Sequence, residues 1–433
     1  MLILIKGGRV IDPGNIDGIM NILIKDGLIA EITADEPVIF GENIRIIEAA
    51  GLIITPGLID MHVHLREPGH EYKETIETGC RAAVSGGFTS ICAMPNTNPV
   101  NDSKEVTHFI LKQAKAAGYA HLYPVGAISQ RLEGKFLSEF FDLKKAGVKA
   151  VSDDGFPVRS SLLMRRALEY AKGFGLLVIS HCEDMELAKS GVMNEGEVST
   201  KLGLGGIPNA AESVAVMRDI ALSELTGARL HIAHVSTKES VNAIRDAKKR
   251  GAPVTAETAP HYFTLTHDAV YGYNTFAKMN PPLRSAEDKK AVCEGLADGT
   301  IDVIATDHAP HSSIEKDVEF EFAANGIVGL ETSLPLSLNL VKDGFLSMGE
   351  LVKKMSKNPA RILGIENTLK PGAVADLTII DPDYLSIVNS ADFKSMGKNT
   401  PFDGMEIKGS AVFTIVKGKV VFEKERPLND QLP

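Results

Sequence analysis

The chain has 433 residues, of which 44% are hydrophobic and 24% are charged. This ordinary globular composition argues against a disordered or fibrous protein, and the length allows two or three domains or one large barrel with an appendage. The net charge of −10 disfavours nucleic-acid binding, because phosphate contacts require clustered lysine and arginine.

The cysteines and the first residues predict the compartment. The chain has only 4 cysteines, none of them in a CxxC pair, so we expect no disulfide framework and a reducing environment. The apolar start at residues 1–5 meets Lys6 and two glycines at once and lacks the features of a signal peptide. No apolar run approaches the ~18 residues of a membrane span. We therefore expect a cytoplasmic protein that does not bind membranes.

Both ends of the chain are rich in short strand-like runs that are bounded by glycine and aspartate turns. The predicted strands are 2–6, 21–25, 28–33 and 44–48 near the start, and 376–380, 411–416 and 419–422 near the end. Chain ends often lie close together, so we expect residues 1–55 and 359–433 to form one small composite β-sandwich.

The middle of the chain, residues 56–358, alternates apolar strands with amphipathic helices. The predicted strands are 58–62, 88–93, 121–125, 148–152, 176–181, 229–234, 253–257 and 301–307, and the helices include 104–117, 162–174, 210–226, 238–250 and 285–297. Eight βα units over about 250 residues predict an α/β fold of the (β/α)8 TIM-barrel type. A doubly wound sheet is the alternative, but no Gly-x-Gly-x-x-Gly motif follows the first strand. The polar loop after Asp307, which runs to Gly326, lies where barrels carry mobile lids.

Polar side chains follow five of these strands, at the carboxyl ends where barrels carry their active sites. His62 and His64 are two residues apart, so the period of a strand places both imidazoles on one side. The other candidates are Asp153 or Asp154, His181, His234 and Asp307. Imidazoles and carboxylates that converge on one pocket suit zinc or a similar divalent ion. The pattern therefore predicts a metal site.

Other polar residues beside these strands have a packing interpretation. Asp60 lies deeper on the face of His62 and is expected to fill a barrel layer. His231 has the opposite strand parity to His234, which predicts that it points toward the helices. His308 is expected to alternate away from Asp307 in the same way.

A set of short motifs runs through residues 58–330 in a fixed order. They are 60–69 (DMHVHLREPG), 94–97 (MPNT), 152–155 (SDDG), 181–183 (HCE), 234–237 (HVST), 257–261 (ETAPH), 279–284 (MNPPLR) and 306–311 (TDHAPH). This ordered set resembles the dihydroorotases of the amidohydrolase superfamily, the class I bacterial type in particular. The resemblance implies the same barrel and the same composite sandwich.

The resemblance also implies a ligand set. His62, His64 and Asp307 would hold one zinc ion, His181 and His234 a second, and Asp154 would bridge the two. Many superfamily members use a carboxylated lysine as the bridge, whereas class I dihydroorotases use aspartate. The nearest lysine, Lys149, lies on the opposite strand face, which agrees with the aspartate bridge. Two ions per subunit are expected, and one is the alternative because some family members hold only one.

The reaction implied is the reversible cyclisation of N-carbamoyl-L-aspartate to L-dihydroorotate, the third step of pyrimidine biosynthesis. Hydroxide at the metal site would attack the ring amide, and Asp307 would act as general base and then as general acid. The substrate contacts implied are His64, Arg66, Asn96 and His311, with Asn280, Asn325 and Gly326 at the ring. The fork of Arg66 suits a carboxylate. Many relatives have Phe-Gly where this chain has Asn325-Gly326.

Two alternatives stay open at this point. A related cyclic amidohydrolase (a dihydropyrimidinase, hydantoinase or allantoinase) would share the barrel but typically keeps the lysine bridge. A non-catalytic dihydroorotase-like subunit of aspartate transcarbamoylase would typically lack several metal ligands, whereas all of them are present here. The small-molecule substrate is the principal expected partner. We also expect a homo-oligomer, and association of an active enzyme with aspartate transcarbamoylase is a further possibility.

Overall fold

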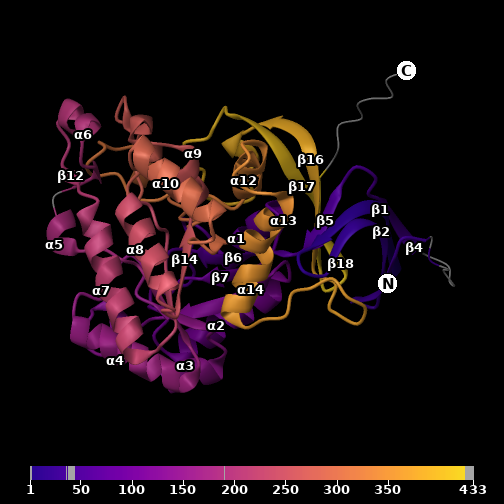
Figure 1. Ribbon diagram of the computed structural model, residues 1–433, viewed down its shortest axis with the longest axis horizontal. Coiled ribbons are helices and arrows are strands. Elements are labelled where there is room, and N and C mark those ends of the chain that lie inside the picture. Colours follow the sequence, from indigo (N-terminus) through magenta and orange to yellow (C-terminus); the bar gives the residue numbers. More distant parts are fainter. Residues whose placement is uncertain (1, 36, 38–43, 190, 425–433) are drawn as a thin grey trace.

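The computed structural model describes residues 2–35, 37, 44–189 and 191–424, so the last residues of the predicted C-terminal segment, 425–433, lie outside the described residues. A helix-covered barrel stands beside a β-sheet region that contains both ends of the described chain (Figure 1). Among the described helices, none is long and apolar enough to cross a membrane.

The barrel consists of parallel strands that are neighbours in the sheet in the same order as in the chain. They are β6 (Leu58–Val63), β7 (Phe88–Ala93), β8 (His121–Gly126), β9 (Ala150–Ser152), β10 (Leu177–Ser180), β13 (Leu230–Ile232), β14 (Val254–Thr258) and β15 (Val303–Ile304). A parallel bridge between Val63 and His308 joins the last strand end to the first. The TIM-barrel prediction is confirmed, and every predicted strand of the middle region is present.

Helices cover the outside of the barrel (Figure 1). The larger ones are α1 (Ile76–Ser85), α2 (Lys104–Ala117), α3 (Phe140–Ala146), α4 (Ser161–Phe174), α7 (Ala210–Thr226), α8 (Lys238–Lys249), α10 (Ala286–Ala297) and α12 (Ser333–Lys342). Their ends follow from local chemistry: α4 begins where the Ser160 hydroxyl accepts from the N–H of Leu163 and ends at Gly175, whose φ is 65°. The apolar face of α8, with Val241, Ile244 and Ala247, is buried.

Shorter elements occupy the loops. They are α5 (Met185–Ala188), β11 (Met193–Asn194), α6 (Glu197–Leu202), β12 (Gly206–Ile207), α9 (Pro260–Thr264), α11 (Ser313–Lys316), α13 (Met348–Val352) and α14 (Asn358–Leu363), with the single-turn segments η1 (Gln130–Leu132), η2 (His267–Val270), η3 (Thr275–Ala277), η4 (Lys353–Lys357) and η5 (Ser390–Asp392). Helix α11 lies in the loop after Asp307, so part of the predicted lid is helical.

The second sheet is built from both terminal segments. Its strands are β1 (Leu2–Asp12), β2 (Ile16–Lys25), β3 (Leu28–Thr33), β4 (Ile44–Glu48), β5 (Ile53–Pro56), β16 (Leu377–Ile387), β17 (Glu406–Val416) and β18 (Lys419–Glu423). The two segments join where β5 pairs antiparallel with β16, with Ile54 opposite Ile379. Both isoleucines are buried in a core shared by the two segments. The composite β-sandwich expected from the termini is thus confirmed.

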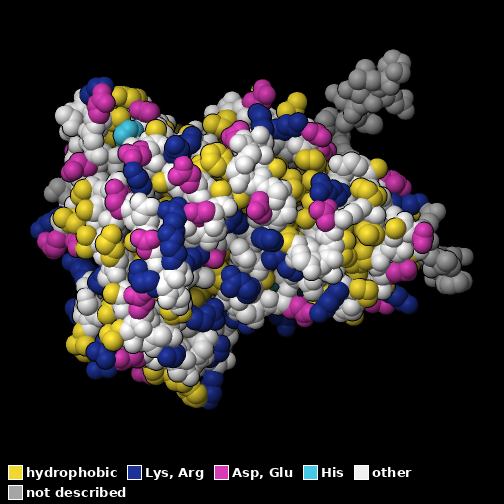
Figure 2. Space-filling model, in the orientation of Figure 1, with side chains coloured by type: hydrophobic (Ala, Val, Ile, Leu, Met, Phe, Trp, Pro, Cys, Tyr) yellow, Lys and Arg dark blue, Asp and Glu magenta, His cyan; other side chains and the backbone are white. Residues whose placement is uncertain are grey.

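The barrel interior is apolar at one end. Ile59, Met61 and Ile179 pack there against Ile362 and Leu363 of α14. This packing fills the interior and leaves the polar strand ends to form the opposite mouth of the barrel. On the surface, charged side chains of both signs are interspersed over the face seen in Figure 2.

Candidate active site

The predicted metal ligands meet at the mouth of the barrel. Two groups of possible ligands occur among the described residues: His62, His64 and Asp154 form one, and Asp154, His181 and His234 form the other. All of these side chains are buried, and within each group the ligand atoms lie within 4.8 Å of one another. The two groups share Asp154, which is the arrangement expected of a bridging carboxylate.

Asp154 occupies the centre of the cluster. Its Oδ1 lies 3.2 Å from His62 Nε2, and its Oδ2 lies 3.3 Å from His64 Nε2. The same Oδ1 is 3.5 Å from His181 Nδ1 and 3.5 Å from His234 Nε2. The neighbouring Asp153 instead accepts hydrogen bonds from the N–H and hydroxyl groups of Ser129.

Asp307 completes the cluster from the end of β15. Its Oδ1 lies 3.2 Å from His64 Nε2 and 3.5 Å from His62 Nε2. Its φ of 51° is unusual for a residue with a side chain and is kept only where the surroundings enforce it. Burial would raise the pKa of Asp307, but the nearby imidazoles outweigh it and lower that pKa overall. The carboxylate is therefore ionised at neutral pH.

Groups behind the ligands orient the imidazoles. His62 Nδ1 lies 2.7 Å from a Glu257 carboxylate oxygen, and His64 Nδ1 lies 2.8 Å from the Asn96 amide oxygen. His181 Nε2 lies 3.2 Å from a Glu183 carboxylate oxygen. Because these oxygens only accept, each of the three imidazoles donates an N–H to its supporting group. The other nitrogens of His62 and His64 face Asp154, whereas His181 Nδ1 lies 2.7 Å from His234 Nε2.

This arrangement fits a divalent cation. The neutral imidazoles direct lone pairs into a centre that already holds the Asp154 and Asp307 carboxylates, and acceptors alone would repel one another. Both His62 Nε2 and Asp154 Oδ1 are buried and have no hydrogen-bond partner. A metal ion, or protons in its place, would satisfy these two atoms. Burial alone would lower the pKa of His62, but the Asp154 and Asp307 carboxylates outweigh it and raise that pKa well above its usual value.

The structure corrects the prediction for His231. Its neighbours Leu230 and Ile232 pack in the core shared with the helices, while His231 Nε2 lies 3.1 Å from a Glu257 oxygen, on the carboxylate that also binds His62. His231 thus faces the barrel interior, and the prediction that it points to the helices is wrong. The parity argument fails because β13 ends at Ile232 and the left-handed φ of His234, 34°, turns its ring inward.

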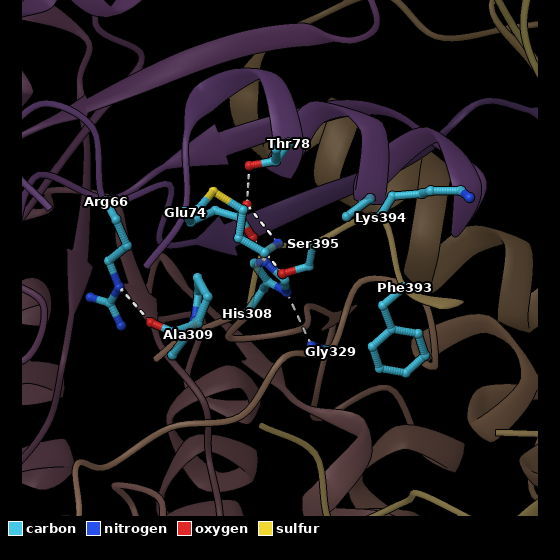
Figure 3. Close-up of polar contacts among 12 residues, drawn as sticks. Arg66, Glu74, Thr78, His308, Ala309, Gly329, Phe393, Lys394 and Ser395 are labelled. Atoms are coloured by element: carbon cyan, nitrogen blue, oxygen red, sulfur yellow. Dashed lines mark hydrogen bonds and ion pairs between the residues drawn. The ribbon is translucent and has the colours of Figure 1, made fainter. Parts of the chain in front are cut away.

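Asp60 and His308 agree with their packing interpretation. Asp60 is fully buried and its Oδ1 accepts from the N–H groups of His62 and Thr306, which links the first and last strand ends. Burial raises the pKa of Asp60 to about 6. His308 faces away from the metal ligands: its Nε2 lies 3.3 Å from Glu74, and its Nδ1 accepts from the N–H of Gly329 (Figure 3).

A cavity of about 200 Å³ opens beside the cluster. All of the predicted substrate contacts line it, together with several of the metal ligands: His64, Arg66, Asn96, Asp154, His181, Asn280, Asp307, His311, Asn325 and Gly326. Drug-sized ligands occupy sites of ~300–1,000 Å³, so this volume favours a smaller molecule.

One wall of the cavity carries a positive charge. Arg66 donates from Nε to the Pro310 carbonyl oxygen at 3.2 Å (Figure 3). Its Nη2 lies 3.4 Å from His311 Nε2, which in turn lies 2.8 Å from the Asn325 carbonyl oxygen. Burial and the adjacent Arg66 lower the pKa of His311 to about 3, so the ring is neutral at neutral pH. This wall suits an anionic group such as a carboxylate.

A second part of the cavity lining offers neutral polar groups. Asn280 donates to Glu183 at 3.0 Å, while its buried amide oxygen has no hydrogen-bond partner. The N–H of Gly326 donates to the Lys278 carbonyl oxygen. Gly326 has a φ of 130°, and a Cβ atom there would come within 2.6 Å of the Ala309 Cβ, so only glycine fits. The Asn280 oxygen is thus a free acceptor at the cavity.

Comparison with known proteins agrees with this geometry. Residues 51–240 match the Dihydro-orotase-like family, and residues 339–422 match the Amidohydrolase family. A dihydroorotase from Geobacter sulfurreducens is 61% identical over 426 residues, which cover 98% of this chain and 100% of the relative. A dihydroorotase from Desulforapulum autotrophicum is 57% identical over 425 residues, with the same coverage of both chains.

Similar solved structures include hydantoinases. The L-hydantoinase (dihydropyrimidinase) from Arthrobacter aurescens has a TM-score of 0.88 and 29% identity, covering 99% of this chain and 97% of the other. The D-hydantoinase from Thermus sp. has a TM-score of 0.84 and 26% identity, covering 97% and 95%. The fold is thus shared with the hydantoinases at similar coverage, whereas sequence identity is far higher for the dihydroorotases. By its sequence, the chain belongs to the dihydroorotase family of the amidohydrolases.

Proposed function

We propose that this enzyme catalyses the reversible ring closure of N-carbamoyl-L-aspartate to L-dihydroorotate with loss of water. One observation carries the proposal: a buried pair of ligand triads that share Asp154 lies in the same cavity as Arg66. The triads suit amide chemistry, and the guanidinium suits the carboxylate that distinguishes dihydroorotate from uncharged cyclic amides.

The metal proposed is zinc, with two ions per subunit. His62, His64 and Asp307 would hold one ion, His181 and His234 the other, and Asp154 would contact both; mixed imidazole and carboxylate ligands suit zinc. When bound, such ions polarise a carbonyl oxygen and lower the pKa of water to about 7. A site with a single zinc ion is the alternative.

Asp307 is proposed as the proton carrier. In ring opening the C–N bond of the ring amide breaks and the nitrogen must gain a proton, which Asp307 Oδ would deliver after taking it from the attacking hydroxide. The same carboxylate would return the proton in ring closure, when the C–N bond forms and water leaves. Its position at the cavity wall and its ionised state at neutral pH support this role.

Substrate recognition is divided between the two walls. Arg66, with Asn96 and His311 beside it, would bind the carboxylate of the substrate. The ring would lie toward Asn280, whose free amide oxygen can accept from a ring N–H, and toward Asn325 and Gly326. His64 would contribute both to the metal site and to the cavity wall.

A hydantoinase-like activity on an uncharged cyclic amide is the second candidate, because the hydantoinase structures share the fold. Assays of one preparation with dihydroorotate, hydantoin, dihydrouracil and allantoin separate the two candidates, provided that the bound metal is measured on the same sample. We expect turnover of dihydroorotate above the others. A preference for an uncharged ring would reject the substrate assignment.

Assembly and compartment are proposed more briefly. The 4 cysteines are all buried and free, which supports a reducing, cytoplasmic setting. We propose a homo-oligomer, which light scattering on the purified enzyme would test. Co-purification would test the further possibility of a complex with aspartate transcarbamoylase.

A further inference from the structure

A segment of the C-terminal part of the chain reaches over to the active-site cavity. Residues 393–399, here termed the strap, lie between η5 and β17. The strap is fastened to the barrel by two carboxylates. Glu331 accepts from the N–H groups of Lys394 and Ser395, and Glu74 accepts from the Ser395 hydroxyl and from the N–H of Met396. Figure 3 shows Ser395 beside Glu74 and His308, below Thr78 of helix α1.

Asn399, at the end of the strap, forms hydrogen bonds through both polar atoms of its side-chain amide with the loop after β15. Its Nδ2 donates to the Ala309 and Gly326 carbonyl oxygens, each at 3.0 Å, and its Oδ1 accepts from the N–H of His311 at 2.9 Å. The Asn399 carbonyl oxygen also accepts from the N–H of Val328 at 2.9 Å. The side chain is 3% exposed, so water does not replace these bonds readily.

The strap lies so close to the loop after β15 that only glycine fits at position 397. A Cβ atom at Gly397 would lie 2.6 Å from the Pro310 Cβ and 2.9 Å from Asn399 Oδ1. The strap therefore packs directly against Pro310, whose carbonyl oxygen accepts the hydrogen bond from Arg66 Nε. A single amide thus joins both chain segments that carry the cavity-lining residues His311 and Gly326.

We propose that Asn399 is a positioning residue for substrate recognition: it holds His311 and the Asn325–Gly326 peptide at the spacing that the substrate requires. Asn399 does not line the cavity, so it acts through these residues and not by contact. The inference rests on the proposed function, since dihydroorotate is the substrate used to measure it.

The test compares Asn399→Ala and Asn399→Asp with the wild-type enzyme. Alanine removes all three side-chain bonds, whereas aspartate keeps the shape but turns an acceptor toward two carbonyl oxygens. We expect each variant to raise KM for dihydroorotate ~10- to 100-fold with a smaller change in kcat, while metal content stays near wild type. Because buried partners are left unpaired, Tm should fall by several degrees without loss of the fold. Asn389→Ala is the matched control, because Asn389 caps η5 with its side chain away from the cavity. Its KM should change less than twofold.

A double-mutant cycle with His311→Ala separates positioning from a general structural role. Because Asn399 also holds the Gly326 peptide, the effect of Asn399→Ala on KM should become smaller, but not vanish, once His311 is truncated. Full additivity, an unchanged KM in the single variants, or loss of the fold in both of them would overturn the proposal. If the wild-type enzyme, loaded with metal, does not turn over dihydroorotate, the proposed function fails instead, before any variant is compared.

Discussion

The two halves of the cavity are held in place in different ways. The metal ligands stand at the ends of neighbouring barrel strands, and their imidazoles are oriented by Asn96, Glu183 and Glu257. The residues proposed to recognise the substrate, His311 and Gly326, lie on the loop after β15 and are held by bonds from elsewhere in the chain.

The loop half is fastened by buried lysines as well as by Asn399. Lys316 donates from Nζ to the carbonyl oxygens of Thr275, Lys278 and Ala324. Lys278 donates in return to those of Phe320 and Glu321. Burial lowers the pKa of Lys316 to about 7, so its bonds do not require a full charge. Together these bonds hold the loop against the segment that carries Asn280. In the proposed function, the barrel would thus supply the chemistry and the cross-linked loop the specificity. The mobility expected for this loop stays a prediction.

Asp307→Asn should have the largest effect, because it removes the proposed proton carrier at the border of the two halves. We expect turnover to fall by ~10²- to 10⁴-fold, and further if a metal ion is lost. Kinetics in both directions, with metal content measured on the same sample, would check this. Asp317→Asn, at the exposed end of α11, is the control. Near-normal turnover in Asp307→Asn would remove the acid–base role.

Arg66→Ala should weaken substrate recognition without affecting metal binding. Truncating one partner of a buried charge contact costs about 2–5 kcal/mol, so kcat/KM should fall about 30-fold or more while the metal content is retained. Arg165→Ala, on the exposed face of α4, should leave both unchanged. Loss of metal from Arg66→Ala would show that the two halves cannot be separated in this way.

Glu257→Gln should weaken metal binding without affecting the loop after β15. The carboxylate orients His62 from behind, and removal of such a partner typically weakens metal binding 10- to 100-fold. Competition with a chelator would measure the change. Metal affinity equal to that of the wild type would mean that Glu257 serves only the packing of His231.

The smallest effect is expected at the outer side of the loop. Glu315 is paired with Lys73 and caps α11 through Ser312; although burial opposes them, these partners lower the pKa of Glu315 to about 2. A carboxyl whose pKa is lowered by folding stabilises the protein fully above pH ~4.5, and this stabilisation is lost as the pH falls toward 2. Glu315→Gln should therefore lower Tm by ~1–2 °C at pH 7, and the difference should narrow below pH 4.5.

Thermal melts at several pH values would measure this difference, with Glu406→Gln on β17 as an exposed control. A difference that grows as the pH falls would contradict the sign of the effect.

The contrast between the halves also explains what the sequence could predict. Side chains alternate in direction every two residues along a strand, so local patterns sufficed to predict the barrel strands and the clustering of His62 with His64. The prediction failed at His231 because β13 ends at Ile232. His234 lies beyond the strand, so the alternation of side chains along the strand no longer relates its direction to that of His231. The loop fastening could not be predicted, because His311 and Asn399 are 88 residues apart and nothing local marks them as partners.

The supporting carboxylates were beyond reach for the same reason. Glu257 is separated from His62 by 195 residues, and its acidic side chain at a strand end resembles any other candidate ligand. Only its strand-end position, shared with the ligands, gave a signal. Its role behind His62 follows from the three-dimensional arrangement.

The most direct test of the central claim measures bound metal and dihydroorotate turnover on one preparation of the wild-type enzyme. We predict divalent metal, near two zinc ions per chain, and activity that disappears on chelation and returns when zinc is added. A metal-free preparation that converts dihydroorotate at the full rate, or a fully loaded one that leaves it unchanged, would contradict this account.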